Sequence, residues 1–243
     1  MWPEARELAA TCPLPAGYRY QRLTRRHIAE TIRAFAAWYP GIAVGNASCH
    51  LRASFYEERV ALDRASERDF YVILVRKGRE LVGVLSVERD HDSAILYGRV
   101  GAISPRHRGL HLSERFPSLI EALGRAMGMG MVYGLATLKH PYMAEKFEQM
   151  GWQLIGIIPG FDIEVVEAGA VKRVYEAIYT KVLADERDFL RPRRADMTPQ
   201  TAELFDVLFP GRAEPSVDHS AAAGAVHRYA TRPALNRAPV AAA

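Results

Sequence analysis

The residues that most clearly suggest chemistry lie in one short segment, SPRHRGLHLSERF, at positions 104–116. A strand-like run precedes it and a helix-like run follows, so backbone N–H groups at the start of the helix would lack partners and attract an anion. Arg106 and Arg108 add positive charge, while Gly109 and Ser113 are small enough to let a phosphate approach the backbone. The segment therefore predicts a loop that binds a phosphate or pyrophosphate group.

Hydrophobic periodicity predicts the elements that would position this loop. Alternating or continuous apolar runs indicate strands over residues 18–23, 70–77, 80–90, 94–104, 131–138, 152–158 and 171–183. Apolar residues at helical spacing indicate helices over residues 25–39, from about 46 onward, 112–127 and 141–150. Residues 159–170 form either a loop or an extension of the preceding strand. The predicted fold class is mixed α/β, with a mostly antiparallel central sheet and flanking helices.

The chain divides into four segments. Residues 1–17 form an N-terminal leader, residues 18–183 form the α/β domain, and residues 184–210 form a linker with a short helix. Thr198 would cap that helix and Pro199 would open it. Residues 211–243 are rich in alanine and proline and show no apolar period, so we expect this tail to be disordered.

Composition indicates an ordinary globular protein. The net charge of +4 on 243 residues is too small to indicate nucleic-acid binding, and no apolar stretch approaches the roughly 20 residues that cross a bilayer. The N-terminus does not resemble a signal peptide, so we expect no membrane association and a cytoplasmic location. Cys12 and Cys49 match neither a metal-binding spacing nor a disulfide framework, and we expect no metal.

Residues 103–156 resemble the acetyl-CoA-binding core of the GCN5-related N-acetyltransferase (GNAT) superfamily. In that family a hydrophobic-x-Pro turn ends a strand, and an Arg-x-x-Gly-x-Gly/Ala loop opens the central helix. The triplet at 103–105, Ile-Ser-Pro, matches the turn, and Arg108 with Gly109 matches the start of the loop. KFEQMGW at 146–152 is similar to the family's Tyr-Glu-Lys-x-Gly-Phe ending. With the order of elements over residues 18–183, the resemblance covers roughly two thirds of the chain.

The resemblance implies an acyl-CoA-binding domain and an N-acyltransferase. An acetyl or other short acyl group would pass from acyl-CoA, the implied co-substrate, to a primary amine by direct attack. The acceptor would be a small molecule or a peptide, and a homodimer is compatible with the family. The implied coenzyme-binding residues are Ala102, Ile103, Arg108, Gly109, Leu110, His111, Leu112 and Ser113.

Two loop positions depart from the family pattern. His111 occupies the first glycine position and Ser113 the glycine or alanine position. If the backbone of His111 is helical or extended, its N–H still points at the ligand and its imidazole lies along the phosphates. The alternative is that His111 packs at the start of the helix.

The catalytic positions also depart from the family pattern. Phe147 stands where family members often have a tyrosine that protonates the leaving thiolate, and the strand that often carries an acidic base has Arg99 and Val100 in register. Tyr142, one turn before Phe147, is the candidate replacement donor, although a helical aromatic of this kind often serves the core or the surface. Glu88, at a strand end, is the candidate base.

Two further features bear on the acceptor. His140 precedes a predicted helix near the expected thiol and is a candidate base or acceptor-site residue. Three acids between the last two strands, Asp162, Glu164 and Glu167, would attract a cationic amine. A solvated hairpin is the simpler interpretation of these acids.

Two other functions fit parts of the pattern. A non-catalytic acyl-CoA-binding or regulatory module would explain why the tyrosine and the strand acid are missing. An unrelated nucleotide-phosphate-binding α/β protein would explain the loop, but it would not explain the KFEQMGW ending.

Overall fold

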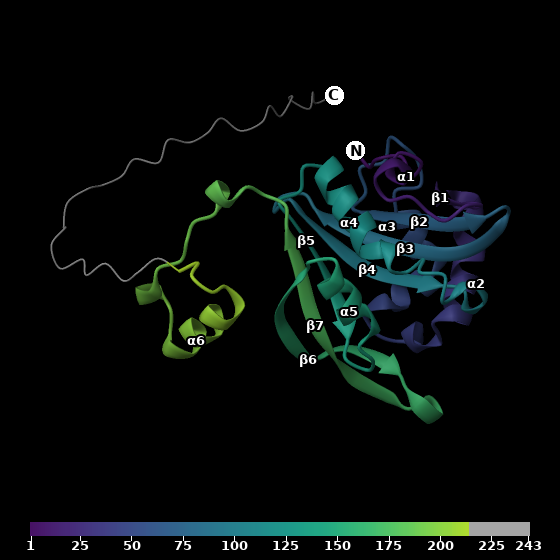
Figure 1. The fold of residues 1–243 in the computed structure, drawn as a ribbon. Coiled ribbons are helices and arrows are strands. Elements are labelled where there is room, and N and C mark those ends of the chain that lie inside the picture. Colours follow the sequence, from purple (N-terminus) through teal and green to yellow (C-terminus); the bar gives the residue numbers. More distant parts are fainter. Residues whose placement is uncertain (214–243) are drawn as a thin grey trace, which may run out of the picture. The chain divides into compact units, whose positions relative to one another are not determined.

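The structure is a computed structural model that describes residues 1–213, and its main feature is a seven-stranded sheet with the order β1-β2-β3-β4-β5-β7-β6 (Figure 1). Every neighbouring pair is antiparallel except β4 and β5. The sheet is thus mixed and mostly antiparallel, which confirms the predicted fold class. The strands are β1 (Tyr18–Arg22), β2 (Phe70–Lys77), β3 (Glu80–Asp90), β4 (Ile95–Ile103), β5 (Met131–Thr137), β6 (Gln153–Val165) and β7 (Val171–Val182).

The parallel pair β4–β5 is joined for only part of its length. Residues 95–98 pair with residues 131–134, and beyond Gly98 and Gly134 the two strands no longer pair. The register between β3 and β4 also skips Arg99, because Ser86 faces Val100 while Val87 faces Gly98. A bulge of this kind bends its strand and redirects a side chain. The second half of β4 therefore keeps β3 on one side and has no strand on the other.

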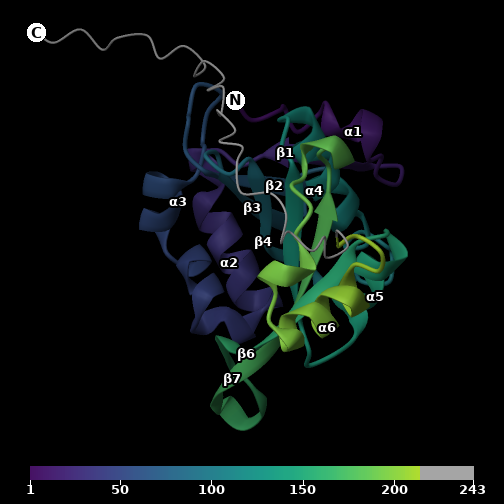
Figure 2. The same ribbon diagram turned by 90° about the vertical axis from the view of Figure 1, so that its left-hand side faces the viewer.

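Helices cover both faces of the sheet, as the turned view in Figure 2 shows. α2 (Ile28–Trp38) and α3 (Ala53–Arg59) pack on one face, and α1 (Leu8–Thr11), α4 (Arg115–Ala126) and α5 (Tyr142–Gln149) pack on the other. Each face has its own hydrophobic core. Phe35 and Tyr56 are fully buried in the first, and Leu119 and Leu123 in the second.

Glycines in β4 and β5 let α4 and α5 approach the sheet closely. A Cβ atom at Gly98 would lie 2.6 Å from Ile120 Cδ1, and one at Gly134 would lie 2.6 Å from Phe147 Cζ. A Cβ atom at Gly101 would likewise lie 2.6 Å from Cδ2 of the Phe116 ring. The space beside Gly101 is therefore taken by α4 and is not open to a ligand.

The N-terminal residues belong to the domain core. Trp2 stacks on Tyr71 with 5.0 Å between ring centroids, its indole Nε1 donates a hydrogen bond to the carbonyl of Arg68, and Leu8 is buried. The compact unit accordingly spans Met1–Phe189, so the segment set apart as a leader is an integral part of it.

The described residues 190–213 belong to a second unit, which contains α6 (Pro199–Leu208). The Thr198 hydroxyl accepts from the N–H of Thr201 at 3.2 Å, and Pro199 takes the first helical position as predicted. The predicted disorder of the tail concerns residues 211–243, of which all but 211–213 lie outside the described residues.

Three predicted elements differ in detail. The helix expected from about 46 is a 3-10 helix, Asn46–Leu51, which an extended Arg52 separates from α3. α4 starts three residues later than predicted, and β6 continues to Val165, so most of the segment 159–170 is strand. Among the described residues, no helix is long and apolar enough to cross a membrane, and no group of His, Cys, Asp and Glu side chains could hold a metal ion.

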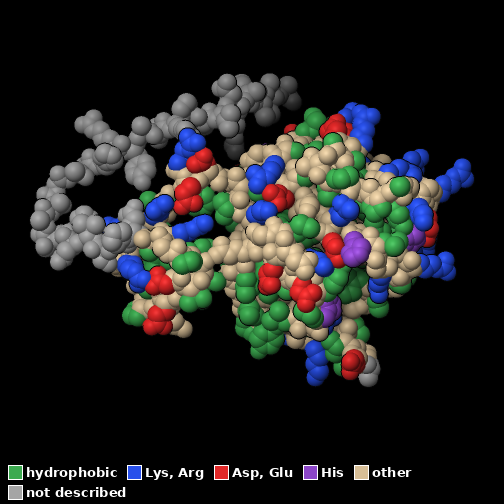
Figure 3. All heavy atoms as spheres, viewed as in Figure 1, with side chains coloured by type: hydrophobic (Ala, Val, Ile, Leu, Met, Phe, Trp, Pro, Cys, Tyr) green, Lys and Arg blue, Asp and Glu red, His purple; other side chains and the backbone are tan. Residues whose placement is uncertain are grey.

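Acidic and basic side chains are interspersed over the face of the sheet domain that Figure 3 displays. Nucleic-acid-binding surfaces instead gather Lys and Arg on one face. The displayed face therefore carries charges of both signs side by side.

His50 is a fully buried histidine on the face covered by α2 and α3. Its ring lies against Phe35, Phe55 and Tyr56, and Nδ1 lies 3.1 Å from the carbonyl oxygen of Ala47. Nε2 has no hydrogen-bond partner among the described residues. Burial lowers the pKa of His50 to about 4, so the folded domain holds it neutral.

We expect this histidine to make the domain sensitive to mild acid. Between pH 6.5 and 4, His50 is protonated in the unfolded chain but stays neutral in the folded chain. The free energy of unfolding therefore falls by about 3 kcal/mol over that range. Urea unfolding of the wild type and His50→Gln at several pH values measures this contribution, with the exposed His91→Gln as control. An equal pH dependence in all three proteins would contradict the assignment.

Candidate active site

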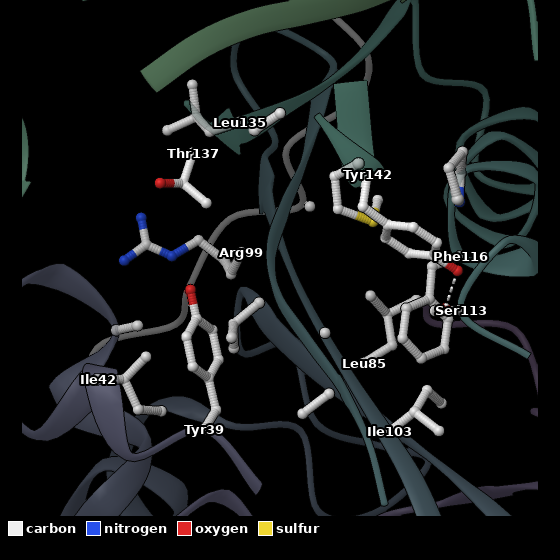
Figure 4. Close-up of a pocket in the computed structure, with 18 of the residues that line it drawn as sticks. Tyr39, Ile42, Leu85, Arg99, Ile103, Ser113, Phe116, Leu135, Thr137 and Tyr142 are labelled. Atoms are coloured by element: carbon white, nitrogen blue, oxygen red, sulfur yellow. Dashed lines mark hydrogen bonds between the residues drawn. The ribbon is translucent and has the colours of Figure 1, made fainter. Parts of the chain in front are cut away.

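A cleft of about 660 Å³ runs along the divergence of β4 and β5 (Figure 4). It starts at the loop before α4, passes between the two strands and ends where the segment after α2 meets β6 and β7. This volume is typical of small-molecule sites. We call one end of the cleft, with Arg108, His111 and Ser113, the loop end, and the other, with Asp162 and Glu176, the acid end.

At the loop end, the backbone offers a run of unpaired donors. Gly109 and His111 have φ angles of +78° and +57°. No backbone carbonyl among the described residues accepts a hydrogen bond from the N–H groups of residues 109–114. Successive N–H groups in such a loop form an anion-binding concavity. Arg108 lies beside it and donates through Nη2 to the carbonyl of Trp38 at 3.1 Å.

The conformation of His111 differs from the expected one. Its backbone is left-handed rather than helical or extended, a conformation that costs a residue with a Cβ about 1–2 kcal/mol and costs glycine almost nothing. Its imidazole is largely exposed, and Nδ1 lies 2.9 Å from Glu114 Oε1. Lys146 Nζ contacts the same oxygen at 3.0 Å, and the hydrogen bonds from His111 and Lys146 lower the pKa of Glu114. The histidine therefore adopts the left-handed backbone that glycine adopts most easily, and its imidazole contacts a neighbouring acid.

A buried histidine supports the loop from below. His107 ends the 3-10 turn Pro105–His107, where Nδ1 lies 2.9 Å from the Tyr18 hydroxyl and Nε2 lies 3.2 Å from Glu80 Oε1. These contacts tie the turn to β1 and to the start of β3. The sequence analysis did not single out His107, and only its place inside the loop motif pointed to a role.

The other predicted coenzyme-binding residues divide into two groups. Ala102, Ile103 and Ser113 line the cleft, as does Leu112, whose side chain is buried in the core. Leu110 is exposed and lies outside the cleft lining. The loop therefore presents backbone, rather than the side chain of Leu110, to the cleft.

The predicted catalytic residues are not brought together. The Tyr142 hydroxyl lies 2.8 Å from Ser113 Oγ, at the loop end (Figure 4). His140 lines the cleft at the junction between β5 and α5. Glu88 lies outside it, in a separate polar hollow, 3.5 Å from Arg99 and 4.0 Å from Arg59. Burial raises the pKa of Glu88 while Arg99 opposes that rise.

Phe147 forms part of the core and also borders the cleft. It is 3 % exposed and its ring packs against Tyr179 and Trp152, with centroid separations of 5.2 and 4.8 Å. The position where family members often have a proton donor is thus filled by an apolar ring.

The acid end contains two carboxylates that already have partners. Glu164 accepts a hydrogen bond from the Tyr39 hydroxyl at 3.3 Å and forms an ion pair with Lys139. Asp162 Oδ1 accepts from the backbone N–H groups of Asn46 and Ile163, each at 2.7 Å. The side chain of Glu164 is 4 % exposed, so the interpretation of this segment as a solvated hairpin is wrong there. Glu167 is exposed in the turn between β6 and β7 and does not line the cleft.

Glu176 is the remaining carboxylate of the acid end. It lies on β7 opposite Thr137 of β5, is 7 % exposed and lines the cleft. Among the described residues, no side chain or backbone group forms a hydrogen bond or ion pair with its carboxylate. Burial, together with the negative charges of Glu164 and Asp162, raises its pKa to about 7, and the positive charge of Lys139 opposes this rise.

Glu176 is not among the residues predicted from the sequence, although the sequence contains a signal for it. In the strand Val171–Val182 the residues Val174, Glu176 and Ile178 share one face, so an acid stands between two apolar residues on a face expected to be covered.

We expect Glu176→Gln to stabilise the domain at alkaline pH. A carboxyl whose folded pKa is raised contributes stability in full below its unfolded pKa and loses it as the pH rises through the folded value, here about 7. Glutamine mimics the neutral form, so at pH 8 the variant should exceed the wild type by about 3 kcal/mol in free energy of unfolding. At pH 5 most of this difference should vanish.

Urea unfolding at pH 5 and pH 8 measures the effect, and Glu167→Gln is the matched control on an exposed site. A variant that is no more stable than the wild type at pH 8 would show that Glu176 ionises normally.

Comparison with known proteins identifies the fold. The sequence matches no protein-family model and no curated protein. Solved acetyltransferase structures are similar. A probable acetyltransferase of the GNAT family from Chromobacterium violaceum is 16% identical, with a TM-score of 0.53 over 75% of this chain and 93% of that one.

Two further solved structures are similar in the same way. A putative acetyltransferase from Salmonella typhimurium, solved with its cofactor acetyl-CoA, is 15% identical, with a TM-score of 0.50 over 71% of this chain and 97% of that one. Spermidine N-acetyltransferase from Vibrio cholerae, in a dodecameric structure, is 9% identical, with a TM-score of 0.54 over 69% of this chain and 94% of that one. These similarities show that the chain shares their fold.

Proposed function

We propose that this chain, which has the GNAT fold, transfers an acetyl or other short acyl group from acyl-CoA to a primary amine. One observation supports the proposal most directly. A single cleft follows the gap where β4 and β5 diverge, with a run of unpaired backbone N–H groups at one end and the buried carboxylate of Glu176 at the other. The donors suit the pyrophosphate of coenzyme A, and the carboxylate suits an amine.

The residues of the loop end fit the coenzyme. The N–H groups of residues 109–114 and the guanidinium of Arg108 would hold its phosphates, and the free edge of β4 at Ala102 and Ile103 would pair with its amide groups. Bound there, acyl-CoA would supply a thioester carbonyl that an amine can attack.

The predicted catalytic residues take different roles in this proposal. Because the hydroxyl of Tyr142 is bonded to Ser113, we assign Tyr142 to positioning the loop and the coenzyme rather than to donating a proton. His140 is retained as a candidate proton carrier, since it lines the cleft beyond β5. Glu88 would act only through Arg99, which lines both the cleft and the hollow that contains Glu88.

One observation favours a second candidate, an acyl-CoA-binding module without catalytic activity. Phe147 is a buried apolar ring at the position where relatives often have a proton-donating tyrosine. Loss of a general acid typically lowers a rate by about 10²- to 10⁴-fold. This candidate predicts tight coenzyme binding and no turnover.

Calorimetric binding of acetyl-CoA, followed by thiol release with a panel of amines and peptides, tests the proposal. We expect binding and turnover in the wild type. Reversing the charge in Arg108→Glu should weaken coenzyme binding roughly 10- to 100-fold, because a charged hydrogen bond to phosphate becomes a repulsion. The matched control is Arg106→Glu, since Arg106 lies on the same loop outside the cleft lining.

Binding without turnover of any acceptor would select the acyl-CoA-binding module. Equal coenzyme affinity in Arg108→Glu and Arg106→Glu would show that the loop does not hold the phosphates. Stabilisation by ATP or NAD but not by coenzyme A would exclude both candidates.

Tyr142→Phe tests the assignment of Tyr142. Removing the hydroxyl breaks its bond with Ser113, so we expect KM for acyl-CoA to rise about fivefold while kcat changes less than twofold, as expected for a loss of one neutral hydrogen bond. Steady-state kinetics with varied acyl-CoA provides both constants. A fall in kcat at constant KM would instead make Tyr142 the proton donor.

A further inference from the structure

Resting on the proposed function, we propose that Glu176 is the base that takes a proton from the acceptor, and that the acceptor is a primary amine that enters as an ammonium ion with no carboxylate beside its nitrogen. The assignment depends on which groups at the acid end already have partners and on the charge that they leave.

Glu176 is distinguished by its lack of a partner. At the acid end, Glu164 is occupied by Tyr39 and Lys139, and Asp162 is occupied by two backbone N–H groups. Glu176 is more than nine-tenths buried, and no hydrogen bond or ion pair reaches its carboxylate from the described residues. Because this carboxylate borders the cleft and has no protein partner, a cationic ligand in the cleft can form a charged hydrogen bond with it.

The charges around Glu176 determine whether the site favours a cationic or an anionic ligand. Asp162 and Glu164 face it from β6, Lys139 faces it from the segment after β5, and the neutral phenols of Tyr39 and Tyr97 also interact with its charge. Arg99 and His140 line the same cleft. Lys139 balances one of the two neighbouring acids. The acid end is therefore negative whenever Glu176 is ionised, which attracts an ammonium group and repels a carboxylate.

Arg99 does not neutralise this charge. Its guanidinium donates to Asn46 Oδ1 at 2.7 Å and pairs with Glu88 at 3.5 Å, so its cation is held by groups of the adjoining hollow. An acceptor carboxylate would have to compete with Glu88 for this cation, and it would also lie near Asp162 and Glu164.

The walls of the acid end suit an organic amine. Ile42, Leu135 and Phe161 supply apolar surface, and Tyr39, Ile42, Arg99 and Thr137 surround the same space in Figure 4. An acceptor with an aromatic or aliphatic body and a terminal ammonium would match this lining.

The reaction balances with one base. The Glu176 carboxylate takes one proton from the ammonium, which frees the nitrogen lone pair to attack the thioester carbonyl carbon. The C–N bond forms and the C–S bond breaks, and the second proton lost by nitrogen goes to the leaving thiolate. The products are an amide and free coenzyme A thiol, and Glu176 returns its proton to water. A carboxylate with a pKa of about 7 is suited to this task, because about half of it is ionised at neutral pH and it accepts a proton readily.

The test uses two matched acceptor pairs, 2-phenylethylamine with phenylalanine and agmatine with arginine, in the wild type, Glu176→Gln and the exposed control Glu167→Gln. Coenzyme affinity from calorimetry shows whether each variant is folded and binds acetyl-CoA. We expect that affinity to be the same in all three proteins, and we expect Glu167→Gln to keep the wild-type rate.

In the wild type we expect each amine to exceed its amino acid at least tenfold in kcat/KM, with kcat/KM rising through pH 7 and then levelling. In Glu176→Gln the rate at pH 7 should fall by about 10²- to 10⁴-fold. Because the variant must draw neutral amine from solution, its kcat/KM should keep rising towards the pKa of the amine, near 10. If Glu176 had a purely structural role, the variant would have a lower kcat/KM, but kcat/KM would still level off above pH 7 as in the wild type.

Three results would overturn the inference. An unchanged pH profile in Glu176→Gln would remove Glu176 as the base and leave the proposed function intact. Preference for the amino acids, or acetyl-CoA binding without acetylation of either amine, would remove the acceptor class. A wild type that does not bind acetyl-CoA would overturn the proposed function itself, and the inference with it.

Discussion

The structure depends on the point where β4 and β5 stop pairing. Their parallel ladder ends at Gly98 and Gly134, where α4 and α5 pack onto the sheet with Ile120 and Phe147, and the bulge at Arg99 follows directly in β4. A side chain at either glycine would push a helix away from the sheet. Beyond this point one edge of β4 has no partner and β4 leads into the loop that opens α4, while β5 stays paired with β7 as far as Thr137, opposite Glu176. The two ends of the cleft are thus produced by one interruption in the sheet.

Each end is then held by its own contacts. His107 ties the loop to Tyr18 and Glu80, so the unpaired N–H groups rest on a fixed turn. At the other end, the segment after α2 lies directly against β6. Gly45, with φ of +78°, is so close that a Cβ there would lie 2.1 Å from the carbonyl oxygen of Ile163. This contact and the bonds to Asp162 hold Tyr39 over the acid end.

The sequence predicted much of the fold, because the strand and helix patterns are strong and the loop motif is local. It failed where the outcome depends on residues far apart in the chain. The left-handed backbone of His111, the burial of Glu164 by Tyr39 and Lys139, and the core position of Trp2 each arise from tertiary contacts. Glu88 and Glu176 show the same limit for the site: both are acids in strands, and only the register of the sheet puts Glu176 in the cleft and Glu88 outside it.

The two ends of the cleft also differ in how they respond to dissolved salt. Arg108 and the N–H groups of the loop are exposed, so mobile ions screen their field over about 8 Å at physiological ionic strength. Glu164 and Glu176 are buried, and their interactions with Lys139 and Asp162 are screened far less. Added salt therefore weakens the attraction for an anion at one end while leaving the attraction for a cation at the other nearly unchanged. Ionic strength becomes a means of separating the two recognition steps in one molecule.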